Sequence, residues 1–383
     1  MKKKFASISS LKEFGLWGKL ADRRIPLSFD LEITARCNNN CRHCYLNLPA
    51  GDSDAQKREL SAEDIEKIAE QAVDLGSLWC LISGGEPLLR EDFSDIYMRL
   101  KKKGLLVSVF TNACLIKSEH IALFKKFPPR DIEVTVYGVT EETYESVTRK
   151  SGSFAAFRQG FDLLINNDIK VRLKAMALRS NFHELPAIAA FCRKYTMDYF
   201  RFDPLLHLRY DRNKERNQEI ISERLTAEEI VQLEQADPDR SDTLIKHCDH
   251  FIFTETNNWN CQHLFHCGAG NGSFTVSPEG FFRLCASLWH PDCIYDLKKG
   301  SLTEAWEVFV PQVRGQTSAD PEFLTKCRSC PIINLCLWCP AHAYLESGRL
   351  DAWSEYFCTV AHARQAAIEK NQNSPKRKKR TVF

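Results

Sequence analysis

Hydrophobic and polar residues alternate along the first half of the chain in a way that predicts a parallel α/β sheet. Short runs of β-branched and aromatic residues, each of strand length, are separated by longer amphipathic stretches with helical period. Such alternation favours strands joined by crossover helices. We expect six strands, at Leu27–Thr34, Leu78–Ser83, Leu105–Thr111, Asp131–Tyr137, Lys170–Ala177 and Tyr199–Asp203.

Start and stop signals mark the helices between these strands. Ser61 precedes an acidic first turn, Gly76 follows the same helix as a C-cap residue, and Thr140 and Ser153 open later helices. Further helices are expected over Thr226–Ala236 and Tyr356–Lys370. We therefore divide the chain into an N-terminal extension (1–26), an α/β domain (27–245), a cysteine-rich domain (246–365) and a basic disordered tail (366–383).

Polar motifs follow four of the predicted strands, at the point where each strand ends. They are Cys37 to Cys44, Gly84 to Pro87, Thr111-Asn112 and Tyr137-Gly138. Because the carboxyl ends of parallel strands meet at one rim of the sheet, we expect these motifs to form one site.

Composition and charge exclude several classes of function. The 383 residues are 44% hydrophobic, which suits a globular core, and the net charge of +2 gives no field that favours nucleic acid or a membrane surface. The basic run Lys376–Arg380 is either a solvated end or a small nucleic-acid contact. Charged residues interrupt the N-terminal segment before any signal-peptide core, so we expect a cytoplasmic protein. In that compartment, sixteen cysteines indicate metal ligation rather than disulfides.

The first cysteine group, Cys37, Cys41 and Cys44, has the spacing of a cluster-binding loop. A four-iron cluster normally takes four thiolates, so three leave one iron open to bind another molecule. A zinc site with His43 as the fourth ligand is the alternative, although adjacent residues rarely reach one tetrahedral centre.

The cysteine spacing, followed by Tyr45, together with Gly-Gly-Glu-Pro after the next strand, resembles the radical S-adenosylmethionine (SAM) superfamily. The resemblance implies a partial (β/α)6 TIM-like barrel, a [4Fe-4S] cluster that chelates SAM, an oxygen-sensitive radical reaction and a flavodoxin- or ferredoxin-type reductant. Its implied SAM contacts are the backbone of Gly84 and Gly85, then Glu86 as acceptor for the ammonium, with Arg149 or Lys174 for the methionine carboxylate. The remaining implied contacts are Pro87, Thr111, Asn112 and Thr135.

The later cysteines resemble the SPASM domain, which carries two auxiliary [4Fe-4S] clusters and so implies three clusters in all. Cys336 and Cys339 are separated by two residues where the family usually has three. The implied ligand sets are Cys261, Cys267, Cys285 and Cys339 for the first auxiliary cluster, and Cys327, Cys330, Cys336 and Cys358 for the second.

Several assignments within the cysteine-rich domain remain open. Cys261 is the least secure ligand; without it the first auxiliary cluster has an open iron, or Cys248 or Cys293 takes its place. Two zinc ribbons are the alternative for the whole region. Outside it, Cys80 and Cys192 are expected to be packed thiols. The side chains expected to shield the second auxiliary cluster from water are Trp338, Trp353 and Phe357.

Members with a SPASM domain mostly modify peptides or proteins, so the resemblance implies a peptide substrate and an oxidative modification or crosslink. A sulfatase-maturing role is disfavoured because Ala286 stands where those members carry an acidic residue. Only 36 residues precede Cys37, so a separate leader-recognition protein is a candidate partner. The loop with His207, Arg209 and Asp211 either lines the substrate cavity or is a solvated run of charges. Radical chemistry on a small molecule, or a non-catalytic iron-sulfur or zinc scaffold, are the alternatives.

Overall fold

The computed structural model describes residues 24–196, 201–237, 241 and 262–372. The chain divides into two compact units, each made of two stretches of sequence. Unit 1 comprises residues 1–224 and 266–315, and unit 2 comprises residues 225–265 and 316–383. The expected domain boundary near residue 245 lies outside the described residues and stays a prediction.

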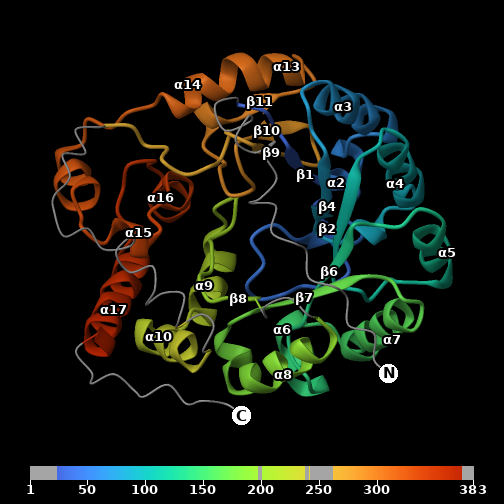
Figure 1. Cartoon of the computed structure of the whole chain (residues 1–383), viewed down its shortest axis with the longest axis horizontal. Coiled ribbons are helices and arrows are strands. Elements are labelled where there is room, and N and C mark those ends of the chain that lie inside the picture. The colour runs from blue at the N-terminus through green and yellow to red at the C-terminus, as the bar shows by residue number, and fades with distance from the viewer. Residues whose placement is uncertain (1–23, 197–200, 238–240, 242–261, 373–383) are drawn as a thin grey trace, which may run out of the picture. The chain divides into compact units, whose positions relative to one another are not determined.

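Unit 1 is built on a nine-stranded sheet whose order is β11-β10-β9-β1-β4-β5-β6-β7-β8 (Figure 1). All six expected strands are present in it, and each pairs in parallel with its neighbour along the chain. The strands are β1 (Ser28–Thr34), β4 (Trp79–Gly84), β5 (Leu106–Thr111), β6 (Asp131–Thr135), β7 (Val171–Met176) and β8 (Arg201–Asp203). The expected α/β fold of partial-barrel type is confirmed.

Three further strands extend the sheet beyond β1. The sequence did not predict them because they are short and lie in the cysteine-rich part of the chain. β9 pairs in parallel with β1, and β10 and β11 continue the sheet in antiparallel pairs. These strands are β9 (Ser273–Val276), β10 (Phe281–Arg283) and β11 (Tyr295–Asp296).

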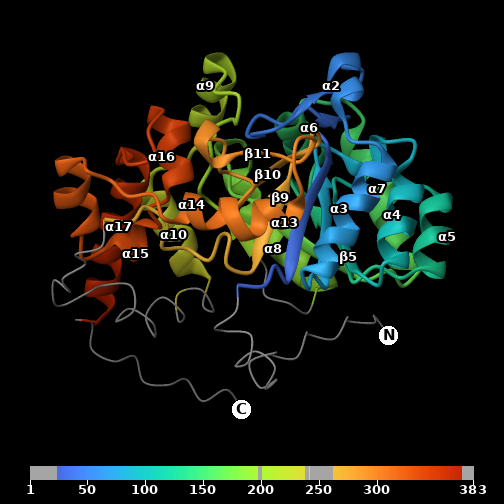
Figure 2. The same cartoon turned by 90° about the horizontal axis from the view of Figure 1, so that it is seen from above.

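The strands of unit 1 bury one face against helices and turn a polar face the other way. In β1, Phe29, Leu31 and Ile33 are fully buried, and they alternate with Asp30 and Glu32. Helices lie along the outer side of the strands (Figures 1 and 2). They include α3 (Ala62–Asp74), α4 (Phe93–Lys102), α5 (Ser118–Lys126), α6 (Glu141–Thr148), α7 (Ser153–Asn166) and α8 (Leu185–Tyr195). Shorter or peripheral helices of unit 1 are α2 (Ser53–Arg58), α9 (Lys214–Glu223), α13 (Leu302–Glu304) and α14 (Val310–Arg314).

The expected helix signals act as caps in the structure. The Ser61 hydroxyl accepts a hydrogen bond from the backbone N–H of Asp64 at 3.1 Å, and Gly76 takes a left-handed conformation with φ of +102° after α3. Thr140 caps α6 in the same way, whereas α7 begins at Ser153 itself with Gly152 as its cap.

Unit 2 is helical in its described part. Its elements are α10 (Ala227–Ala236), α15 (Ile333–Cys336), α16 (Pro340–Ser347) and α17 (Glu355–Gln372). Thr226 and Glu229 cap α10 reciprocally, and α17 runs slightly beyond both of its expected limits. A buried ion pair joins Arg364 of α17 to Glu234 of α10 at 2.7 Å. None of the helices in the described residues has the length and apolar character needed to cross a bilayer.

Candidate functional site

The three-cysteine loop leaves the carboxyl end of β1 and is closed at its base by a small second sheet. In that sheet β2 (Arg36–Cys37) pairs in parallel with β3 (Leu48–Pro49). Backbone N–H groups within the loop point at two of the sulfur atoms, from Asn39 to Cys37 Sγ at 3.4 Å and from Asn47 to Cys44 Sγ at 3.3 Å. Hydrogen bonds to sulfur of this kind surround thiolates that bind iron-sulfur clusters.

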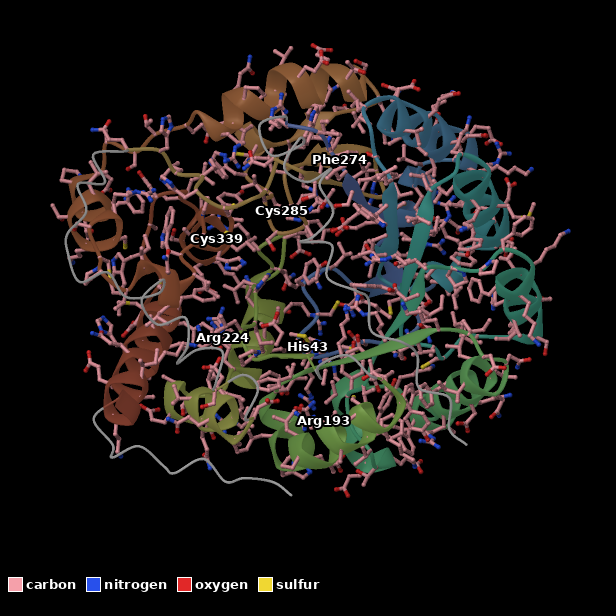
Figure 3. All side chains as sticks on the ribbon, viewed as in Figure 1. His43, Arg193, Arg224, Phe274, Cys285 and Cys339 are labelled. Atoms are coloured by element: carbon pink, nitrogen blue, oxygen red, sulfur yellow. The ribbon has the colours of Figure 1, made fainter. Side chains whose placement is uncertain are left out.

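Burial raises the pKa of Cys37, Cys41 and Cys44, and neighbouring thiols, Cys44 among them, raise the pKa of Cys37 and Cys41 further. Three charged thiolates would therefore be unstable here without a bound cation, since ligation is what stabilises the deprotonated form. The donor set fits an iron-sulfur cluster on this ground. Within the described residues, no three His, Cys, Asp or Glu side chains lie close enough to share a single metal ion. His43, labelled in Figure 3, is half-buried in the same loop, and its Nδ1 atom is buried without a hydrogen-bond partner.

The two glycines of Gly84-Gly85 are required by the chain itself. A Cβ on Gly84 would lie 2.2 Å from the carbonyl oxygen of Thr34, and one on Gly85 would lie 2.3 Å from that of Arg36. The sequence argument explained these glycines by the approach of a cofactor. In the structure, Gly84 and Gly85 at the end of β4 instead lie directly against the backbone that leads into Cys37.

Glu86 joins the ends of β4 and β5. Its fully buried carboxylate accepts hydrogen bonds from the Thr111 hydroxyl at 2.8 Å, the Asn112 N–H at 2.8 Å and the Leu88 N–H at 3.1 Å. Burial raises the pKa of Glu86 to about 7, and these donors oppose the rise. Pro87 begins the short 3₁₀ turn η2 (Pro87–Leu89) that Glu86 caps.

The structure thus brings together Glu86, Thr111 and Asn112, as the sequence predicts. Asn112 continues the connection to the cysteine loop, because its amide donates to Asn38 Oδ1 at 2.8 Å. The role of Glu86 as acceptor for an ammonium group stays a prediction.

The other expected cofactor contacts lie further along the rim. Thr135 ends β6 and faces Lys174 of β7 in register. The Lys174 ammonium lies 3.3 Å from the centre of the Phe110 ring and 3.6 Å from Glu133. Arg149 binds the carboxylate of Glu219 at 2.7 Å and the carbonyl oxygen of Asn40 at 2.8 Å. Arg149 therefore holds the cysteine loop in this structure, and a carboxylate contact for either cation stays a prediction.

Two arginines, which the sequence did not connect with the three-cysteine loop, also hold that loop in place. The Arg209 side chain is only 3% exposed, and its guanidinium donates to the carbonyl oxygens of Cys44 at 3.4 Å and Asn47 at 3.3 Å. Arg216 donates to the carbonyl oxygen of Cys41 at 3.1 Å. Since Arg209 is buried, the interpretation of its segment as a solvated run of charges is wrong. Asp211, two residues further on, pairs with Arg209 at 2.8 Å, and this short spacing of opposite charges is a sequence signal that could have indicated an ion pair.

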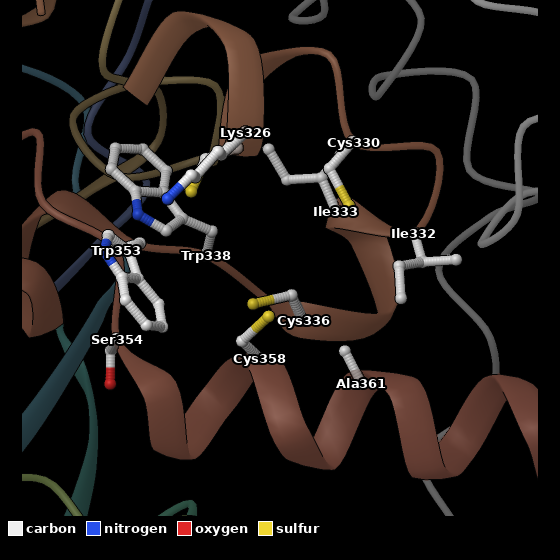
Figure 4. A pocket seen from close by; sticks show the side chains of 11 residues that line it. Lys326, Cys330, Ile332, Ile333, Cys336, Trp338, Trp353, Ser354, Cys358 and Ala361 are labelled. Carbon is white, nitrogen blue, oxygen red and sulfur yellow. The ribbon is translucent and has the colours of Figure 1, made fainter. Parts of the chain in front are cut away.

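A second cysteine site lies within unit 2. Four cysteines line a cavity of about 240 Å³, with Trp338 and Trp353 at its edge, and the thiols of Cys336 and Cys358 point toward each other (Figure 4). The four are the expected set of Cys327, Cys330, Cys336 and Cys358. Burial raises the pKa of Cys327 to about 11 and that of Cys336 to about 12, and the neighbouring thiols add to both shifts. Phe357, the third expected shield, is buried beside His342.

The first auxiliary set stays a prediction. Cys261 lies outside the described residues, as does the substitute Cys248, and the other three members are divided between the units. Cys267 and Cys285 belong to unit 1 and Cys339 to unit 2. The remaining substitute, Cys293, is fully buried, and Cys80 and Cys192 are packed thiols as expected.

A family model described as the radical SAM superfamily matches residues 31–192, which span β1 to α8. The three-cysteine loop and the Gly84-Gly85-Glu86 turn lie inside this match. The chain therefore contains a radical SAM domain.

Individual relatives of this chain cover more of it than the family model does. The subtilosin biosynthesis protein AlbA of Bacillus subtilis is 28% identical over 272 residues, which are 68% of this chain and 55% of AlbA, so the chain spans about half of that relative. An AdoMet-dependent heme synthase of Methanosarcina barkeri is 23% identical over 357 residues, covering 86% of this chain and 95% of the relative. Among solved structures, Streptococcus suis SuiB bound to the precursor peptide SuiA superposes with a TM-score of 0.65 at 16% identity, over 89% of this chain and 78% of SuiB. That last likeness shows a shared fold.

Proposed function

We propose that this chain cleaves SAM reductively and uses the 5′-deoxyadenosyl radical to abstract hydrogen from a peptide or protein, giving an oxidative modification or a crosslink. When bound, the [4Fe-4S] cluster of the three-cysteine loop would supply the electron for that cleavage. Cys37, Cys41 and Cys44 would hold it, and Glu86, Thr111 and Asn112 would position the cofactor at its open iron. Two further clusters would be held by the SPASM-type cysteines.

The observation that carries the proposal is the gathering of two separate cysteine sets. Three thiols lie in one loop at the rim of the sheet, and four others line one cavity in unit 2. The first set comes from one short loop, whereas the second is assembled from different elements: α15 supplies Cys336 and α17 supplies Cys358. A cavity lined almost wholly by sulfur and apolar side chains suits a group that thiolates ligate and that water must not reach.

Peptide substrates are supported by two of the relatives. AlbA is a bacteriocin biosynthesis protein, and SuiB was solved with a precursor peptide. Ala286, in place of an acidic residue after Cys285, argues against sulfatase maturation. A leader-recognition partner and a flavodoxin- or ferredoxin-type reductant belong to the same proposal.

Tetrapyrrole chemistry is the second candidate. The Methanosarcina heme synthase is a relative that matches almost end to end, with 95% of its length aligned. A small-molecule substrate would place the same radical against an iron porphyrin instead of a peptide.

Anaerobic reconstitution tests the shared chemistry first. The purified chain, given iron and sulfide and then dithionite and SAM, should release 5′-deoxyadenosine. Replacing Cys37, Cys41 and Cys44 together by Ala should abolish that release but leave iron bound in unit 2. The matched control replaces Cys80 and Cys192, two packed thiols, by Ala and should retain SAM cleavage. Zinc in place of iron and sulfide would contradict the proposal.

The substrate class is decided by mass spectrometry of the products. Candidate precursor peptides and iron coproporphyrin are each incubated with the reduced enzyme. A peptide that loses two mass units supports peptide oxidation, whereas loss of carbon dioxide from the porphyrin supports the second candidate.

A further inference from the structure

A five-residue segment that follows β8 contacts the surroundings of two cysteines in unit 1. We call residues 207–211, from His207 to Asp211, the bridge segment. On one side, the Arg209 guanidinium donates to Cys44 O, Asn47 O and Asn47 Oδ1 at 3.4, 3.3 and 3.1 Å. The Tyr210 backbone N–H also donates to Tyr45 O at 3.3 Å. One end of the cysteine loop is therefore bound to this segment through both side chain and main chain.

On its other side the bridge segment meets the turn that contains Cys285. The Tyr210 ring packs against the Trp289 ring with centroids 4.6 Å apart, and Trp289 Nε1 donates to Ala286 O at 2.9 Å. His207 Nδ1 lies 3.1 Å from the hydroxyl oxygen of Ser287. The residues next to Cys285 are thus held by the same segment that holds the residues next to Cys44.

These contacts form a stiff connection. Arg209 is buried, and Asp211 compensates its charge by accepting hydrogen bonds from Nη2 at 2.8 Å and from Nε at 3.0 and 3.2 Å. The Trp289 ring also contacts the Arg283 guanidinium, whose carbon lies 3.7 Å from the ring centre. Closely packed groups of this kind transmit a displacement instead of absorbing it, because protein interiors have little free volume.

We propose that the bridge segment couples the geometry of the three-cysteine loop to that of the Cys285 turn. Arg209 and Tyr210 are positioning residues: they act on the first cluster site through Cys44, Tyr45 and Asn47, and on the Cys285 turn through Trp289. The functional meaning of this coupling rests on the proposed function, because that function makes both Cys44 and Cys285 cluster ligands. A substrate or cluster that moves the Cys285 turn would then change the site at which SAM is held.

Hydrogen-deuterium exchange of the full-length chain tests the coupling without any bound group. Trp289→Ala removes contacts with Tyr210, Arg283 and Ala286, and through Tyr210 it should speed the exchange of amides 38–47 at least tenfold. Trp289→Phe keeps a ring against Tyr210 and should restore slow exchange. Faster exchange confined to residues 281–290 would overturn the proposal.

Two additions keep the test decisive. If Trp289→Ala unfolds the unit, α4 amides will also exchange faster. Tyr210→Leu then takes the place of Trp289→Ala, with Tyr210→Phe as its control. Faster exchange of amides 38–47 in Tyr210→Leu would support the coupling, and faster exchange confined to residues 281–290 would overturn it. In reconstituted protein, Trp289→Ala should raise the dissociation constant for SAM at least fivefold and alter the electron paramagnetic resonance signal of the SAM-bound cluster, whereas Trp289→Phe should not. A wild-type chain that binds no SAM would refute the proposed function, but the exchange result would still decide the coupling. Unchanged affinity and signal in Trp289→Ala would show that the coupling does not reach the cofactor.

Discussion

Gly85→Ala is expected to separate the end of β4 from the backbone that leads into Cys37. The added Cβ would lie 2.3 Å from the Arg36 carbonyl oxygen and 2.7 Å from that of Ala35. An ordinary carbon-oxygen contact is about 3.3 Å, so the two backbones must move apart by about 1 Å. Both obstructing atoms belong to the main chain, which leaves no side chain to rotate away.

The loss of unfolding free energy can be estimated from the contacts that this shift disrupts. Gly85 N–H donates to Thr34 O at 2.7 Å and Glu86 N–H donates to Arg36 O at 2.9 Å, and each such bond contributes about 1 kcal/mol. Overpacking adds about 1–3 kcal/mol. We expect unit 1 to lose about 3 kcal/mol of unfolding free energy, which lowers its Tm by roughly 10 °C for a unit of this size.

The assay is thermal unfolding followed by circular dichroism, with Gly51→Ala as the matched control. A Cβ at Gly51 meets no atom within 4 Å, so that variant should unfold close to the wild-type temperature. Iron uptake by the three-cysteine loop should also fall in Gly85→Ala, because Arg36 and Cys37 move together. If Gly85→Ala unfolds within 1 °C of Gly51→Ala, on the order of experimental error, the close backbone contact is not what this glycine provides.

Three further changes test other parts of the molecule. Burial, with Glu32 and Glu133 nearby, raises the pKa of Asp30 from 3.8 to about 6, so Asp30 favours folding below pH 4 and loses that contribution as the pH rises through 6. Relative to Asp30→Asn, the wild type should lose up to about 3 kcal/mol of stability over that range, and parallel pH profiles in denaturant titrations would contradict this. Glu234→Gln leaves the buried Arg364 charge without its partner and should lower the free energy of unfolding in urea by about 3–5 kcal/mol. Glu369→Gln, at an exposed position of α17, should leave it unchanged, and equal effects of the two changes would be evidence against a buried pair. Arg209→Gln removes a charged donor from three acceptors and should lower the free energy of unfolding by about 2 kcal/mol. Lys214→Gln, at an exposed position, is the control and should leave the free energy of unfolding unchanged; an equal effect of the two changes would contradict this prediction.

The sheet was predictable because its signals are local. Each of the six parallel strands is a short apolar run bounded by turn residues. The helices that follow Ser61, Thr140 and Thr226 are predictable because these side chains are N-caps. The rim site follows from topology, since parallel strands end at the same edge. For this reason the sequence located Glu86, Thr111 and Asn112 together although 25 positions separate the first two.

The parts that the sequence did not predict depend on distant contacts. Arg209 looks like an ordinary surface cation in the sequence, and only the approach of Cys44 and Asn47, more than 160 positions away, makes it buried. The contact of Gly84 and Gly85 with the backbone before Cys37 was also not predicted, because local sequence shows that a glycine is needed without showing which atom approaches it.

The pairing of β9 with β1 explains how two distant cysteine segments come to share unit 1. Ser28 to Leu31 of β1 align with Ser273 to Val276 of β9, and β10 returns beside β9 two residues before Cys285. The strand that leads toward Cys37 and the hairpin that leads to Cys285 are therefore fixed in register by main-chain hydrogen bonds. Sheet register is strongly specified where one face is buried, and Phe29 stacks on Phe274 across this pair at 5.3 Å. Because that sheet fixes the bases of both segments, the bridge segment needs to hold only their ends, which makes a short run of five residues sufficient to couple them.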